Sequence, residues 1–141
     1  MRHLLIILPI VSLAASSVTA QQEPGQVGYP SVKAALDALK RDPSAAMQEQ
    51  SGWTIVSNRE GTDPVLWSFT PSTHPAYPAV VKRTVLQDRG QVSVHMAVLC
   101  EAAKPACDEL VADFKALNDG LRADIQRRAA RPPDAGEGGR R

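Results

Sequence analysis

The residues from Trp53 to Cys100 alternate between apolar and polar types with a period of two, the spacing of half-buried β-strands. Three turn-forming stretches interrupt the alternation, at residues 58–64, 71–78 and 88–90, the last with the hairpin sequence Asp-Arg-Gly. Connections this short favour antiparallel neighbours, since a parallel crossover needs a dozen or more residues. The sequence therefore predicts a four-stranded antiparallel meander. Its strands are expected at residues 53–57, 65–70, 79–87 and 91–100.

A helix is expected on each side of this region. Residues 31–41 place apolar side chains on one helical face behind Ser31, a suitable N-cap, and Pro43 prevents continuation. The second helix begins near Pro105 and carries an apolar stripe from residue 107 to 117, which Leu121 and Ile125 extend. The Asn-Asp-Gly sequence at 118–120 could interrupt it.

The last predicted strand shows the clearest alternation, with Val92, Val94, Met96, Val98 and Cys100 on one face. Only one face of the sheet is expected to be strongly apolar, so both helices should cover that face. The predicted fold is an α+β domain of two layers, in the order α-β-β-β-β-α. Residues 45–50 fit either a helical turn or an extended lead into the first strand.

The N-terminus has the three parts of a secretory signal. Arg2 precedes an apolar run from residue 4 to 15, and small residues then lead to Ala20. The run is shorter than the roughly 20 apolar residues that cross a bilayer, and Cys100 is the first cysteine, so neither a membrane nor a lipid anchor is expected. We expect a signal peptide at 1–20, a flexible lead-in at 21–28, one domain at 29–128 and a disordered basic tail at 129–141. The mature protein is expected in the periplasm or secreted.

Removal of Arg2 with the leader leaves 15 basic residues against 15 acidic ones. A nucleic-acid-binding protein would show a basic stripe for phosphate contacts, so nucleic acid is not an expected partner. The remaining roughly 120 residues suffice for one domain with one core.

Cys100 and Cys107 are the only cysteines, and both lie in the exported part. An oxidising compartment and an even count favour a disulfide between the last strand and the second helix. The C-x6-C spacing differs from the C-x-x-C of thioredoxin-like enzymes, so a structural bridge is expected.

No catalytic set, cofactor motif or metal-ligand spacing is evident. The exported part has two histidines, His74 and His95, and two isolated histidines do not specify a metal site. His95 is expected on the polar face of its strand. No local signature presents a serine as a nucleophile beside either histidine.

The segment from residue 67 to 83 is the most distinctive part of the chain. Three prolines stiffen its loop, which restricts the backbone and lowers the entropy lost on docking. Rigid loops that carry aromatic and cationic side chains are common recognition surfaces, although prolines can also serve only to connect strands. The candidate binding residues are Trp67, His74, Tyr77, Lys82 and Arg83.

This segment, with the sequence W-x-F-T-P-x-x-H-P-A-Y-P, follows S-G-W-T-I-V at residues 51–56 and precedes V-L-C-E-A-A-K-P-A-C at residues 98–107. In these motifs the chain resembles small exported proteins of Gram-negative bacteria, over residues 28–117. The resemblance implies an envelope location. It implies no activity, so no functional residue is carried over.

The leading hypothesis is a non-enzymatic periplasmic module that binds another envelope protein or a cell-wall-associated ligand through residues 67–83. Two alternatives stay open. One is an inhibitor or immunity protein against an envelope enzyme, and the other is a small periplasmic hydrolase with His74 as general base. The sequence leaves the oligomeric state open.

Overall fold

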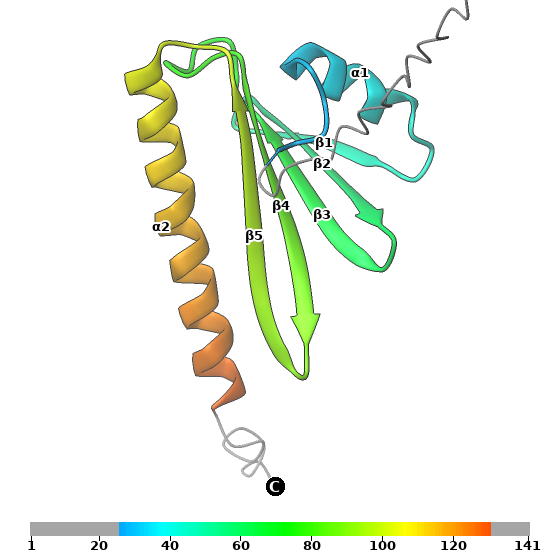
Figure 1. Ribbon diagram of the computed structural model, residues 1–141, viewed down its shortest axis with the longest axis vertical. Coiled ribbons are helices and arrows are strands. Elements are labelled where there is room, and N and C mark those ends of the chain that lie inside the picture. The colour runs from blue at the N-terminus through cyan, green and yellow to red at the C-terminus, as the bar shows by residue number, and fades with distance from the viewer. Residues whose placement is uncertain (1–25, 131–141) are drawn as a thin grey trace, which may run out of the picture.

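The computed structural model describes residues 26–130, in which one antiparallel sheet lies between two helices (Figure 1). The strands are hydrogen-bonded in consecutive order from β1 to β5. The predicted α+β class and antiparallel meander are therefore confirmed, while the predicted leader and residues 131–141 of the tail lie outside the described residues. Neither of the two described helices has the length and hydropathy needed to cross a membrane. The elements are α1 (Val32–Arg41), β1 (Ala46–Gln50), β2 (Trp53–Glu60), β3 (Asp63–Phe69), β4 (Ala79–Asp88), β5 (Gln91–Cys100) and α2 (Lys104–Ala129).

The sheet has five strands, so the prediction of four is wrong. Residues 46–50 form β1, which pairs with β2 from Ala46 opposite Ser57 to Gln50 opposite Trp53. All five residues of β1 are exposed, and the strand is held by backbone hydrogen bonds at the sheet edge. Its sequence shows no alternation because neither of its faces is buried, which explains why periodicity did not find it.

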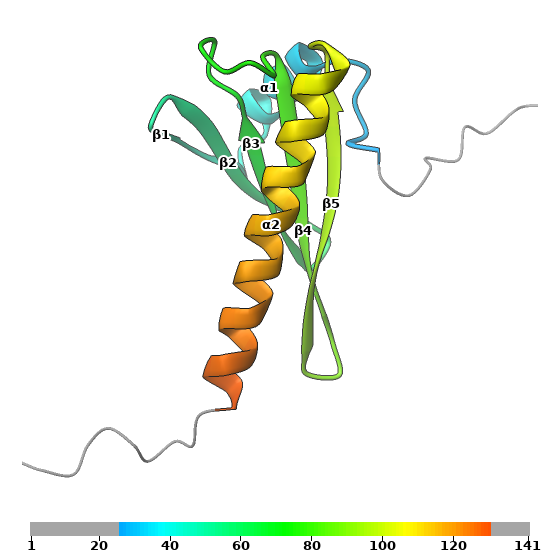
Figure 2. The ribbon, with the colours of Figure 1, turned by 90° about the vertical axis from the view of Figure 1, so that its left-hand side faces the viewer.

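The two helices lie on opposite faces of the sheet, so the predicted two-layer arrangement is also wrong (Figure 2). Trp67 of β3 pairs with Lys82 of β4, which pairs with Ala97 of β5. Since paired residues point to the same face, Trp67 lies on the side opposite Met96 and Val98. The apolar stripe of β3 and the apolar stripe of β5 therefore need separate covers, and the fold has three layers.

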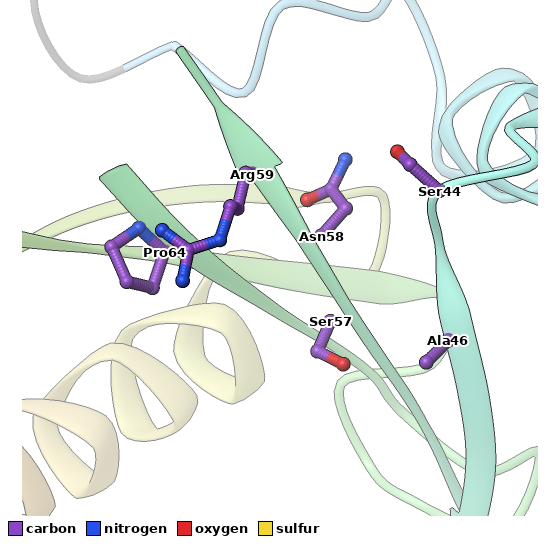
Figure 3. A pocket seen from close by; sticks show the side chains of 6 residues that line it. All are labelled: Ser44, Ala46, Ser57, Asn58, Arg59 and Pro64. Atoms are coloured by element: carbon purple, nitrogen blue, oxygen red, sulfur yellow. The ribbon is translucent and has the colours of Figure 1, made fainter. Parts of the chain in front are cut away.

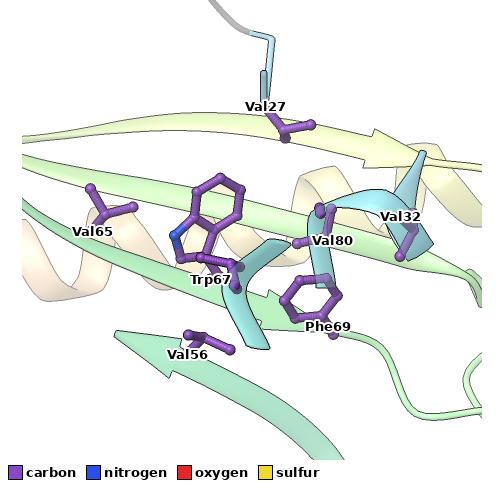
Figure 4. Packing of buried hydrophobic residues seen from close by; sticks show 9 residues of the cluster. Val27, Val32, Val56, Val65, Trp67, Phe69 and Val80 are labelled. Atoms are coloured by element: carbon purple, nitrogen blue, oxygen red, sulfur yellow. The ribbon is translucent and has the colours of Figure 1, made fainter. Parts of the chain in front are cut away.

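The core on the α1 side is built around Trp67, which is 1% exposed (Figure 4). Its indole Nε1 donates a hydrogen bond to Asn58 Oδ1 at 3.0 Å, and the ring of Tyr29 packs against it at 5.8 Å. The Lys82 ammonium lies 5.0 Å from the centre of the indole ring, within the range of a cation–π contact. The buried residues of this core are Val27, Val32, Ala35, Leu39, Val56, Val65, Trp67, Phe69 and Val80.

Helix α1 begins as the sequence predicts. The Ser31 hydroxyl accepts a hydrogen bond from the Ala34 amide, and Glu101 Oε1 accepts one from the Val32 amide. These bonds satisfy two of the amides that a helix start leaves free. Val27 is 4% exposed, so the core already begins within the segment expected to be a flexible lead-in.

A second core lies under α2, where Leu110 and Phe114 pack on Ala79 and Val81 of β4. The helix continues through residues 118–120 without a break, so the alternative of an interruption there is wrong. Asn118 is buried against the sheet, with its amide nitrogen 3.6 Å from the Met96 sulfur. An asparagine that favours turns elsewhere thus lies inside a helix where tertiary contacts hold it.

A polar chain connects the end of α1 to the Trp67 core. Asp42 follows α1 and accepts hydrogen bonds from the hydroxyl and the amide of Ser44 and from the side-chain amide of Asn58. These donors, Ser44 first and Asn58 after it, lower the pKa of Asp42 below its usual value. Because Asn58 also accepts from Trp67, the carboxylate helps to orient the amide that satisfies the indole.

Two replacements of Trp67 should distinguish how much its buried volume and its hydrogen bond each contribute to stability. We expect Trp67→Ala to lower the free energy of unfolding by about 3–5 kcal/mol, because a buried ring leaves a cavity. Trp67→Phe keeps most of the apolar volume but removes the bond to Asn58, so a smaller loss of about 1–2 kcal/mol is expected. Urea unfolding of both variants measures the difference. Equal losses would contradict the stabilising contribution assigned to the buried volume of the ring.

The Asp42 carboxylate should make stability depend on pH in the acid range. A carboxyl group whose pKa is lower in the folded protein contributes stability above the unfolded pKa, about 3.9, and loses it as pH falls through the folded pKa. We expect the urea midpoints of wild type and Asp42→Asn to differ near neutral pH and to converge below about pH 3.9. A difference that stays constant with pH would contradict this role.

Candidate functional site

The loop of residues 70–78 joins β3 to β4 and has a closed neck. Thr70 is buried, and its amide donates a hydrogen bond to the carbonyl oxygen of Ala79 at 3.0 Å. Its hydroxyl accepts a hydrogen bond from the Ala79 amide at 2.9 Å. These bonds bring the two ends of the loop together before its first exposed residue.

Hydrogen bonds within the loop hold its tip. The His74 amide donates to the Pro71 carbonyl at 3.0 Å, and the Tyr77 amide donates to the His74 carbonyl at 2.9 Å. The imidazole Nδ1 of His74 accepts a hydrogen bond from the Ala76 amide at 3.0 Å. His74 is therefore the central connection of the loop, and the loop has little freedom left to lose on binding.

Neighbouring segments support the loop from both sides. On one side is the turn between β1 and β2, where Gly52 has a φ of +82° and an added Cβ would lie 3.4 Å from Pro71. On the other side the Glu101 amide donates to the Pro78 carbonyl at 2.9 Å. Glu101 lies within the short segment that the Cys100–Cys107 disulfide closes, with a Cα–Cα distance of 5.8 Å. The predicted bridge is present, and it lies beside the loop.

A row of four side chains extends from the loop across the α2 side of the sheet. The ring of His74 meets the edge of Trp53 at 5.2 Å, Trp53 packs on Phe114 at 5.8 Å, and the Arg83 guanidinium lies 5.3 Å from the centre of the Phe114 ring. Burial lowers the pKa of Arg83 below the usual arginine value. The row connects the loop to the core under α2.

The five predicted binding residues do not form one surface. Trp67 and Lys82 touch each other on the α1 side, where the Lys82 side chain is only 15% exposed and its ammonium pairs with Glu60 at 2.7 Å. His74 and Arg83 belong to the row on the α2 side. Of the five, only Tyr77 faces outward, with 51% of its surface exposed.

Tyr77 is the one exposed aromatic residue of the chain, since all six aromatics lie in the described part. Around it the loop exposes small or polar residues, namely Ser72, Thr73 and Pro75. A tyrosine on a firmly held backbone provides apolar area and a hydroxyl with little loss of entropy on binding. This arrangement suits recognition of a partner surface.

The contacts of His74 stabilise its own loop. Its Nδ1 is occupied by the backbone amide of Ala76, and no hydrogen bond in residues 26–130 joins it to a serine or a carboxylate. His95 is exposed on β5, paired with Thr84. Within the same residues no three His, Cys, Asp or Glu side chains lie close enough together to hold a metal ion.

Two shallow hollows lie away from the loop. The alternation of apolar and polar residues in the sequence did not predict either of them. One, of about 380 Å³, lies beside β1 and β2 (Figure 3). The other, of about 420 Å³, shares Arg59 and Pro64 with it and extends to Val85 and Val92. The Arg59 guanidinium donates to the Thr62 carbonyl at 2.9 Å. Their linings combine this single cation with hydroxyl, amide and apolar groups, and Asp63 is the only carboxylate.

Comparisons of the chain with protein-family models, with curated proteins and with solved structures found no match. The W-x-F-T-P-x-x-H-P-A-Y-P motif covers the end of β3 and the loop as far as Pro78. The motif therefore includes the whole loop of residues 70–78.

Loss of the disulfide should weaken the fold by an amount set by the short segment it closes. The double variant Cys100→Ser, Cys107→Ser is expected to lose about 2–3 kcal/mol of unfolding free energy on the chain-entropy model. Urea unfolding with and without reductant measures the loss. The reductant should shift the wild type to the value of the variant and leave the variant unchanged.

Proposed function

We propose that the protein is an exported, non-enzymatic interaction module that binds another envelope protein through the loop of residues 70–78. The observation that carries the proposal is the exposure of Tyr77 on a loop held from within and from both sides. Tyrosine is among the residues enriched at the energetic centres of interfaces. A loop fixed before binding loses less entropy on association than a mobile one.

The surroundings of Tyr77 favour a protein partner. Ser72, Thr73 and Pro75 are exposed beside it and carry no charge, so the surface combines apolar area with hydroxyl groups. Interfaces between proteins favour aromatic residues at the centre with polar groups around them. An inhibitor or immunity protein against an envelope enzyme would be a special case of this role, while a hydrolase gains no support from the contacts of His74.

Export supports the same proposal. The leader of residues 1–20 has the composition of a secretory signal. The disulfide beside the loop is typical of proteins that fold in an oxidising compartment. The periplasm is therefore the compartment in which we place the partner.

Substitution of Tyr77 tests the proposal. Tyr77→Ala should weaken capture of the partner from a periplasmic extract by about thirtyfold or more, the size of an interface hot spot. Tyr77→Phe keeps the ring and should retain most of the binding. Because the side chain is half exposed, the urea midpoint of both variants should stay close to wild type.

Met47→Ala is the matched control, because Met47 is similarly exposed but lies on β1, away from the loop. It should leave capture unchanged. Isolated cell walls provide the second arm, in which binding to the wall alone would identify a wall-associated ligand as the target instead of a protein. Equal capture by Tyr77→Ala and wild type would show that the loop is not the site.

A further inference from the structure

The apolar stripe of α2 continues onto an exposed part of the helix surface. Leu110 and Phe114 are buried, whereas Leu117 and Leu121 are 55% and 43% exposed. These are two of only four large apolar side chains exposed in residues 26–130. Residues four apart are neighbours on a helix surface, so the two leucines form one exposed apolar contact area.

Gly120 lies beside these leucines, three residues after Leu117. A glycine inside a helix costs about 1 kcal/mol relative to alanine. No contact in the described chain accounts for this glycine, because a Cβ at this position would meet no atom within 4 Å. A missing side chain does allow another backbone to approach closely. We call Leu117, Gly120 and Leu121 the α2 patch.

The charges of α2 indicate what could cover the α2 patch. Glu109 and Asp113 lie in its first half, and neither has an ion-pair partner among residues 26–130. Arg127 and Arg128 lie in its last turn, and Arg127 also pairs with Asp124 of the same helix. Two such helices packed in parallel would bring like charges together. Packed antiparallel about the α2 patch, they would bring Glu109 and Asp113 of each helix toward Arg127 and Arg128 of the other.

We propose that the α2 patch binds the α2 patch of a second copy of this chain, with the two helices antiparallel. Leu117 of one copy then packs beside Leu121 of the other, and the glycines let the backbones approach. Glu109 and Asp113 of each copy face Arg127 and Arg128 of its partner. The inference does not rest on the role of Tyr77, because the loop lies near the N-terminal end of α2 and the α2 patch lies in its other half (Figures 1 and 2).

Sedimentation velocity over a wide range of protein concentration tests the pairing. The wild type should change from the sedimentation coefficient of a monomer to that of a dimer as concentration rises. Gly120→Gln should weaken the dimer by at least tenfold in Kd, because the side chain blocks close approach. The same change should raise the urea midpoint of the monomer, since glutamine favours a helix more than glycine does.

The opposite effects of Gly120→Gln on association and on stability separate a lost contact from a lost fold. Met47→Ala, which removes an exposed apolar side chain elsewhere, should leave the dimer unchanged. A wild type that is monomeric at every concentration would overturn the proposal, as would a Gly120→Gln variant that dimerises like the wild type. Neither result would bear on partner capture through Tyr77.

Charge reversal tests the orientation. The double variant Glu109→Lys, Asp113→Lys should not self-associate, because its lysines would face the arginines of the other copy. Mixing it with the double variant Arg127→Glu, Arg128→Glu should restore the dimer. In a parallel pair residues 109 and 113 would face their own copies, so the first variant would dimerise no worse than wild type. That outcome would overturn the antiparallel arrangement.

Discussion

The pairing register of β3, β4 and β5 is the constraint from which the rest of the architecture follows. Trp67, Lys82 and Ala97 lie across from one another, and so do Ser68, Val81 and Val98. Because side chains alternate along each strand, the first row points to one face of the sheet and the second row points to the opposite face. Both faces consequently carry apolar groups that water must not reach, and the chain provides one helix for each. A shift of one residue in this register would exchange the two faces and leave neither helix with a matching surface.

Features that depend on neighbouring residues could be predicted from the sequence. The alternation of β5, the cap at Ser31 and the hairpin at residues 88–90 are local signals, and the structure has all three. The placement of the helices depends on how separate strands align, which no single strand reveals. The eight residues from Pro71 to Pro78 hide that alignment in the sequence, since their number does not determine which face of β4 continues which face of β3. β1 escaped detection because it contributes backbone hydrogen bonds and no buried side chain.

The candidate site shows a similar limit. Long charged side chains such as Lys82 and Arg83 are usually exposed, yet here one covers the Trp67 indole and the other covers Phe114. Each aromatic ring offers an apolar face that also attracts a cation, so the stems and heads of these side chains are held against the core. His74 has a side chain that could act as a general base, but its imidazole accepts a hydrogen bond from the Ala76 amide of its own loop. Tyr77 alone could be assigned to the surface from its position among prolines.

The disulfide gives the loop a dependence on its chemical surroundings. The Pro78 carbonyl is bonded to Glu101, and Glu101 belongs to the short segment that Cys100 and Cys107 close. While both thiols are reduced, that segment has one restraint fewer, and the outer side of the loop is supported less firmly. A chain with both thiols reduced would thus hold the loop that carries Tyr77 less firmly than the oxidised chain does. The oxidation state of the two cysteines thus bears on how firmly the loop is supported at Pro78.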